Sequence, residues 1–166
     1  MPCIRLDLAH RRDHMAVYEI VKIGDPVLRE KAKTVTKFNA NLGRLMDDMY
    51  DTMVAAKGVG LAAPQIGISK RVVVIDVGDG RIELVNPEIL EAEGSQIDVE
   101  GCLSIPDFQE EVNRSQRVKV KAQNRNGEEY VIEGTGFLAR ALQHEIDHLE
   151  GVLFVDLLDK NVPTRE

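Results

Sequence analysis

The stretch that decides the expected fold is residues 136–150, which read GFLARALQHEIDHLE. Apolar residues recur through it at helical spacing, and Thr135 and Gly151 are a candidate N-cap and a candidate terminator. We therefore predict an amphipathic helix here. On its wheel, a broad buried side is formed by Phe137, Leu138, Ala141, Leu142, His144, Glu145, His148 and Leu149. The side chains expected on or toward the opposite face are Arg140, Gln143, Asp147 and Glu150.

The buried side of this helix carries the pattern H-E-x-x-H in His144, Glu145 and His148. Residues four apart share a helix face, so both imidazoles can reach one cation, and Glu145 can point at the same space. Burying a carboxylate beside two imidazoles is costly unless something compensates them, and a divalent metal would do so. The alternative is a pair of core histidines bonded to the backbone, with the glutamate paired to one of them.

A catalytic metal site of this kind needs a third protein ligand and one open position. No histidine follows His148, which leaves Asp156 and Asp159 as weak downstream candidates. Upstream, Cys102 lies beside Gly101, which permits close backbone approach. A lone cysteine is usually a small buried hydrophobe, but the missing ligand favours Cys102 as the third one.

Working outward, the remaining pattern predicts an α+β fold of mixed or antiparallel strands packed around this C-terminal helix. A Met-rich helix is expected over 39–57, with Asn39 or Asn41 as its cap. Residues 124–127 are typical of a hairpin turn. The strands are expected over 17–23, 71–77, 82–86, 89–93, 117–123 and 129–133.

Length and composition limit the organisation and the class of protein. With 166 residues, one domain is the default. We expect a mobile N-terminal extension over 1–14, a single catalytic metallohydrolase domain over 15–160 and a short tail over 161–166. The formal net charge of −7 argues against general nucleic-acid binding. No apolar run is long enough for a membrane span, and two cysteines form no disulfide framework, which favours a cytoplasmic protein.

The extension holds Cys3, His10 and His14, so the expected domain keeps one cysteine and two histidines. His10 and His14 also stand four residues apart, but their segment has no apolar face and is expected to be disordered.

A third motif follows the Met-rich helix, where residues 58–67 read GVGLAAPQIG. It lacks the Lys and Ser/Thr of a phosphate loop, so nucleotide binding is not expected. Its small residues allow a ligand to approach the backbone, and Gln65 offers a neutral donor and acceptor. By itself the segment favours a helix stop followed by a Gly/Ala/Pro loop.

Together, three segments resemble the motifs of bacterial peptide deformylases. They are G-x-G-L-A-A-x-Q at 58–65, E-G-C-L-S at 100–104 and Q-H-E-x-D-H at 143–148. The resemblance extends from about Val17 to Leu158 and includes residues 24–29 and 153–156. Asp107 stands at a position where the family often carries glycine.

The resemblance implies hydrolysis of the formyl group from the N-terminal formylmethionine of new proteins, with release of formate. It implies Cys102, His144 and His148 as metal ligands and Glu145 as general base and acid. The Leu103 backbone N–H and the Gln65 side-chain amide would stabilise the oxyanion.

The resemblance also places the backbone of Gly60 against the substrate peptide and implies iron(II) as the natural metal, with zinc, nickel or cobalt possible in a preparation. For the methionine side chain, Val59, Ile105 and Leu142 are candidate lining residues, although each could equally be ordinary core.

The rival interpretation is an H-E-x-x-H metalloprotease, which leaves the other two motifs unexplained and would need a downstream ligand. A closed structural metal site is disfavoured because no fourth ligand is evident. The expected partners are a formylmethionyl peptide and, transiently, the ribosome. The segment after Asp159 shows no basic helix, so a ribosome contact would have to rest on a local patch.

Overall fold

In the computed structural model, the backbone is described for residues 4–6 and 16–161, and side chains for 16–158. The expected extension therefore lies outside the described residues except for Ile4–Leu6, which form strand β1 and pair antiparallel with β2. The extension and the tail stay predictions.

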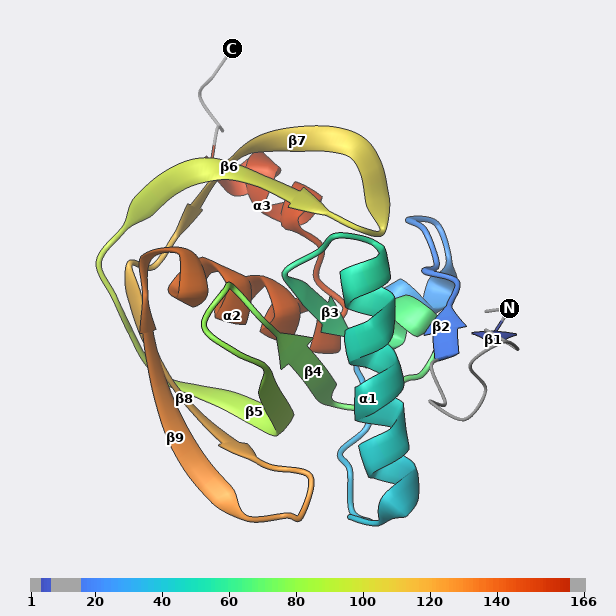
Figure 1. Cartoon of the computed structure of the whole chain (residues 1–166). Helices are drawn as coiled ribbons and strands as arrows, with labels where there is room; N and C mark the ends of the chain where they lie inside the picture. Colours follow the sequence, from blue (N-terminus) through green and yellow to red (C-terminus); the bar gives the residue numbers. More distant parts are fainter. Residues whose placement is uncertain (1–3, 7–15, 162–166) are drawn as a thin grey trace.

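The element order confirms the expected α+β class (Figure 1). The strands are β1 (Ile4–Leu6), β2 (Ala16–Tyr18), β3 (Gly60–Ala62), β4 (Val72–Ile75), β5 (Ile82–Glu93), β6 (Gln96–Cys102), β7 (Ile105–Arg114), β8 (Arg117–Gln123) and β9 (Glu129–Thr135). The helices are α1 (Ala40–Ala55), α2 (Gly136–Leu149) and α3 (Phe154–Asn161), with short 3-10 turns η2 (Pro26–Arg29) and η3 (Ala63–Ile66).

A five-stranded sheet in the order β3-β4-β5-β8-β9 separates the two large helices. All its neighbours pair antiparallel. Alternation along β4 shows the two faces, because Val73 and Ile75 pack with α2 whereas Val72 and Val74 pack with the methionines of α1. In Figure 1 the sheet curves around α2, and α1 stands beside β3 and β4.

The expected helices and most strands are confirmed with small shifts in their ends. Asn39 caps α1, its side chain accepting a hydrogen bond from the Leu42 N–H at 3.2 Å. Thr135 occupies the N-cap position of α2, but its side chain makes no capping bond. The strands expected over 82–86 and 89–93 are one strand, β5, with register shifts. The strand expected over 17–23 is shorter, as β2.

A hairpin that the sequence pattern did not reveal, β6–β7, forms its own two-stranded sheet and arches over α2 and α3 (Figure 1). Its buried apolar residues, Ile105 and Val112, pack with Leu153 and Phe154 in a small separate core. Most of its side chains are exposed, so it lacks the strong alternation by which β8 was recognised. This hairpin brings Cys102 to α2.

Candidate active site

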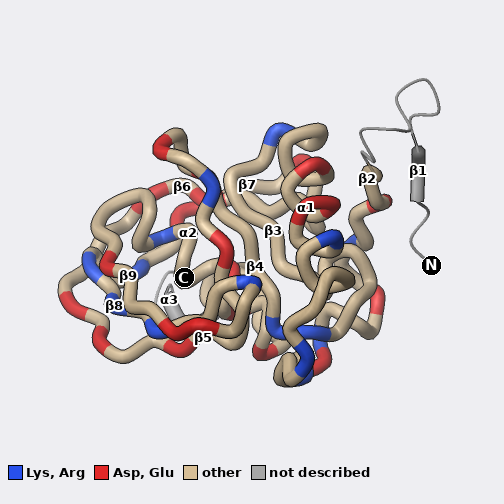
Figure 2. The backbone as a smooth tube through the Cα atoms, turned by 60° about the horizontal axis from the view of Figure 1, so that its bottom comes forward, with Lys and Arg blue, Asp and Glu red and all other residues tan. Residues whose placement is uncertain are grey.

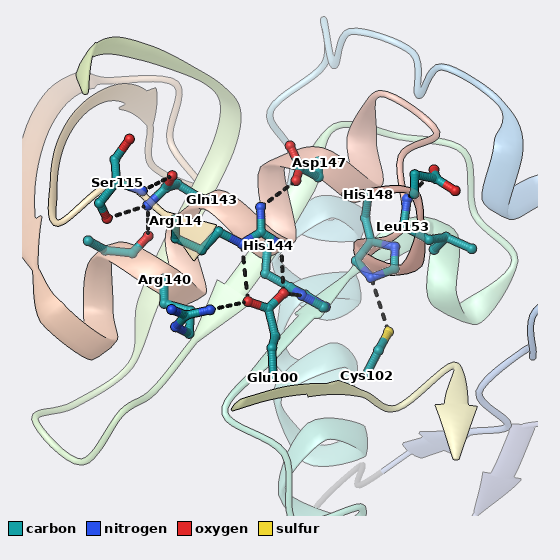
Figure 3. Close-up of polar contacts among 12 residues, drawn as sticks. Glu100, Cys102, Arg114, Ser115, Arg140, Gln143, His144, Asp147, His148 and Leu153 are labelled. Atoms are coloured by element: carbon teal, nitrogen blue, oxygen red, sulfur yellow. Dashed lines mark hydrogen bonds and ion pairs between the residues drawn. The ribbon is translucent and has the colours of Figure 1, made fainter. Parts of the chain in front are cut away.

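The end of β6 and the buried face of α2 bring together the three predicted metal ligands. Among the described residues, Cys102, His144 and His148 place one ligand atom each within 4.8 Å of one another. Cys102 Sγ lies 3.3 Å from His148 Nε2 (Figure 3). Asp156, the downstream alternative, instead pairs with Arg29 at 2.6 Å, and the side chain of Asp159 is outside the described residues.

The donor set suits one divalent cation, since a thiolate and two imidazoles leave a further position open. The charges agree. Burial alone would lower the pKa of His144, but hydrogen bonds with Cys102 and Glu100 raise it to about 10. Burial and the nearby His144 lower the pKa of His148 well below its usual value. The groups around His144 thus favour positive charge at this position, and a bound divalent cation would also supply it.

Glu100 holds the first of these histidines in place. Its carboxylate accepts hydrogen bonds from Arg114 at 2.6 Å and Arg140 at 2.8 Å, and its Oε2 lies 2.5 Å from His144 Nδ1 (Figure 3). Burial alone would raise the pKa of Glu100, but hydrogen bonds and charge interactions with His144 and Arg114 hold it far below its usual range. Nδ1 is thereby engaged, which leaves His144 Nε2 to face the cluster. Glu100 was quoted in a motif, but only its partners reveal this role.

Two residues expected toward solvent, Arg140 and Gln143, are in fact buried, at 4% and 8% exposed. The β6–β7 hairpin covers this face of α2, so Arg140 reaches Glu100 and Gln143 exchanges hydrogen bonds with the Ser115 backbone at 2.9 and 3.0 Å. Conversely Phe137, expected in the buried stripe, is 56% exposed. A helical wheel that assumes one buried face fails here because α2 is covered on two sides.

Glu145 points into the same site and is 5% exposed. Its Oε1 is buried and has no hydrogen-bond partner within the described part of the chain. Burial raises the pKa of Glu145 to about 7, although His144 lowers it in part. Gly60 lies against this carboxylate, because a Cβ built there would stand 2.5 Å from Glu145 Oε2. A buried carboxyl with a free oxygen is a suitable acceptor for a proton from water.

The Gln65 amide is fixed with its donor side toward the cluster. Its Oε1 accepts from the Ala62 N–H at 2.9 Å, while its Nε2 lies 3.2 Å from Ser104 Oγ and 3.8 Å from Cys102 Sγ. Leu103 follows Cys102 directly, and both Gln65 and Leu103 line the same cavity. The Gln65 amide therefore stands beside the predicted ligands, and Leu103 lines the cavity next to it.

A cavity of about 740 Å³ opens over this cluster. Val59 and Ile105 line it, together with Phe108 and Phe137 from the hairpin and α2. Leu142, the third candidate for the methionine pocket, is fully buried in the core between α2 and the sheet instead.

Asp107 has a φ of +63°, a conformation that glycine adopts without strain. This conformation explains why glycine suits the position. Asp107 itself lies in β7 and lines the cavity.

Comparisons with known proteins cover nearly all of the described chain. The family model described as polypeptide deformylase matches residues 17–163. A peptide deformylase of Heliobacterium modesticaldum is 70% identical over 149 residues, which is 90% of this chain and 99% of that protein. One from Carboxydothermus hydrogenoformans is 58% identical over 148 residues, covering 89% and 97%.

Solved structures agree with the sequence relatives. The crystal structure of a peptide deformylase from Thermotoga maritima has a TM-score of 0.84 at 51% identity, covering 85% of this chain and 97% of that chain. That of Synechococcus elongatus, in complex with actinonin, has a TM-score of 0.82 at 40% identity, covering 87% and 84%. Family model, relatives and fold point the same way, and the chain belongs to the peptide deformylase family.

Proposed function

We propose that this metal-dependent deformylase hydrolyses the formyl amide of N-terminal formylmethionine on new polypeptides and releases formate. The observation that supports this best is the buried Glu145 carboxyl, whose Oε1 lacks a partner among the described residues, beside the cluster of Cys102, His144 and His148. Glu145 is not one of the three proposed ligands, so it can accept a proton while they hold the metal.

The chain's own residues divide the reaction between them. A divalent ion held by the three ligands would lower the pKa of a water molecule toward neutrality and polarise the formyl carbonyl. Glu145 takes the proton of the attacking water and then delivers it to the leaving amine of methionine. Because Glu145 is not a ligand, it is free to move this proton without releasing the metal.

Gln65 and Leu103 are proposed to stabilise the charge that develops on the formyl oxygen. The Gln65 amide cannot turn freely, since Ala62 and Ser104 hold its two ends. A donor oriented before the reaction starts needs no reorganisation, and each such donor contributes roughly 3–4 kcal/mol. The Leu103 backbone N–H would be the second donor.

The substrate peptide is proposed to lie along Gly60 and Val59, where the cavity is open. Gly60 leaves room for Glu145, which a side chain would displace. Val59 is 39% exposed and can contact an apolar substrate side chain. Ile105, at the same cavity, is the better supported of the other two lining candidates.

The natural metal is proposed to be iron(II), with zinc, nickel or cobalt as substitutes. A thiolate beside iron(II) makes the active form sensitive to oxygen. None of the helices in the described part of the chain has both the length and the apolar character that a membrane crossing requires. A cytoplasmic location and a transient ribosome contact are proposed because the substrate is a nascent chain.

The test is release of formate from a formyl-methionyl peptide under anaerobic conditions, with iron(II) or nickel supplied. Activity should disappear on chelation. Glu145→Gln should retain the metal and lose about 10²–10⁴-fold in turnover. No formate release by the metal-loaded wild-type protein would contradict the proposal, and cleavage of internal bonds in unformylated peptides would favour the protease alternative.

A further inference from the structure

The chain that follows β2 has no part in the function proposed above, yet it runs between two elements of the active site. The sequence pattern favoured a strand over 17–23, but β2 ends at Tyr18, and the next residues, as far as Gly24, belong to no helix or strand. In Figure 1 this chain leaves β2 in blue and rises toward the turn between β6 and β7. We call residues 20–24 the strap.

Two alternate N–H groups of the strap bind the two segments that carry the proposed oxyanion donors. The Val21 N–H donates to the main-chain carbonyl of Gln65 at 2.8 Å, and the Ile23 N–H donates to the carbonyl of Ser104 at 2.9 Å. The Gln65 carbonyl lies near the end of the 3-10 turn η3, where carbonyl groups have no partner within the turn itself. The strap therefore completes the hydrogen bonding of η3 and, at the same time, holds the β6–β7 turn.

Ser104 connects the strap to both donors. It follows Leu103 in the tight turn that the pairing of Cys102 with Ile105 closes. Its carbonyl accepts from the strap, and its hydroxyl lies 3.2 Å from Gln65 Nε2. Among the described residues, no strand of the β6–β7 hairpin pairs with a strand of the five-stranded sheet. The distance between the two donor segments therefore depends on links of this kind.

The strap is itself fixed at both of its ends. Upstream, the Tyr18 N–H donates to Thr52 Oγ1 of α1 at 2.9 Å. Downstream, the Asp25 N–H donates to the Lys22 carbonyl at 3.1 Å and closes a turn in which Gly24 has a φ of +107°. Figures 1 and 2 both place β2 beside α1, at the opposite end of the molecule from β8 and β9. We therefore expect a weakened strap to leave the sheet around α2 intact.

We propose that Val21 and Ile23 are positioning residues of the oxyanion site, whose N–H groups hold the segments of Gln65 and Leu103 at the separation that lets both donors reach the formyl oxygen. This inference rests on the proposed function, in which the two donors stabilise the same charge. A donor that is oriented beforehand needs no reorganisation, whereas hydrogen bonds weaken steeply with misalignment. Because the charge develops only in the transition state, a loosened strap lowers kcat and leaves substrate binding nearly unchanged.

The test is Ile23→Pro, which removes the N–H that binds Ser104. With Gly24 at its third position, the turn over residues 22–25 has the type II pattern, in which proline is common at the second position. On a formyl-methionyl peptide, the variant should lose about 10–100-fold in kcat while KM stays within about threefold of the wild-type value. Its metal content should match that of the wild type.

The matched control is Ile23→Ala, the conservative variant, because it shortens a side chain that is 46% exposed and keeps the N–H. Its kcat should stay within about twofold of the wild-type value. An unchanged kcat in folded Ile23→Pro, or an equal loss in Ile23→Ala, would overturn the proposal. A loss of metal in parallel with kcat would also overturn it, since that result indicates a purely structural role.

A second measurement does not depend on activity. Hydrogen exchange followed by mass spectrometry should be faster over residues 103–105 in Ile23→Pro and unchanged in α2. If the proline variant does not fold, the α-hydroxy acid counterpart of isoleucine at position 23 replaces the N–H with an ester oxygen for the same assays. Wild-type protein that releases no formate would contradict the proposed function alone, because the exchange rates would still show whether the strap holds the turn. Unchanged exchange over 103–105 would overturn the proposal.

Discussion

At the scale of single residues, the site depends on buried side chains that orient the predicted ligands through hydrogen bonds. Glu100 engages His144 Nδ1, and Arg114 and Arg140 in turn hold Glu100 within hydrogen-bond distance. A buried carboxylate flanked by two guanidinium groups keeps its charge, so it can orient the imidazole and raise its basicity as a ligand. The predicted metal site is thus supported by a network of buried side chains that do not belong to the ligand set.

Glu100→Gln should weaken metal binding by about 10–100-fold, because a neutral amide orients His144 poorly and leaves two buried guanidinium groups without their anion. Competition with a chromophoric chelator measures the change. Circular dichroism controls for folding, since the removal of a buried partner also lowers stability. An unchanged metal affinity in a folded variant would show that Glu100 serves packing alone.

Gly60→Ala should reduce turnover strongly while the fold survives. The added Cβ would meet the Glu145 carboxylate at 2.5 Å, so the carboxylate must move away from the reacting water. Formate-release kinetics measure the loss. Gly43→Ala is the matched control, because there the nearest atom belongs to the flexible end of Arg125, at 3.3 Å. Similar activity of both variants would contradict the proposed close approach.

At the scale of elements, α1 carries charges that its neighbours compensate only in part. Asp47 pairs with Arg81 and Arg125. Burial, together with the nearby Asp51 and Asp47, raises the pKa of Asp48 to about 6. The folded state therefore holds this proton more tightly than the unfolded chain does. Stability falls as the pH rises from about 4 to about 6, and above that range the full penalty is present.

Asp48→Asn should raise Tm slightly at pH 7.5, by no more than about 2 °C because the side chain is partly exposed. The gain should fade as the pH falls through 6 toward 4. Asp76→Asn is the opposite control, since Asp76 accepts hydrogen bonds from Tyr50 and Gly78, and its lowered pKa marks a stabilising charge. Thermal melts of both variants at pH 7.5 and at about pH 4 measure these effects. A lower Tm for Asp48→Asn at pH 7.5 would show that the charged Asp48 does not destabilise the fold.

The helices show how far sequence patterns predict elements. The spacing of apolar residues identified α1 and α2 nearly to their ends, because each packs a continuous apolar stripe against the sheet. It misplaced Arg140, Gln143 and Phe137, since burial there depends on the hairpin that crosses α2. A buried arginine that pairs with a carboxylate far away in the sequence has the same local sequence pattern as an arginine exposed to water. Only the contact in the folded structure distinguishes the two cases.

At the scale of the whole molecule, the site is assembled from segments far apart in the chain. Cys102 comes from the β6–β7 hairpin, whereas His144 and His148 come from α2. Motifs and their order indicated that these residues belong together, but no periodicity predicted the hairpin that delivers the cysteine. A metal bound to both elements would also link them, and would stabilise the fold by the free energy of binding.

The most direct measurement of this account is the metal content of anaerobically reconstituted Cys102→Ala, compared with the wild type and with Cys3→Ala. Cys3 is the matched control, as the chain's other cysteine. We predict one metal ion per chain and formate release for the wild type and for Cys3→Ala, and loss of both for Cys102→Ala. Full metal retention by Cys102→Ala would contradict the assignment of Cys102, His144 and His148 as the metal site.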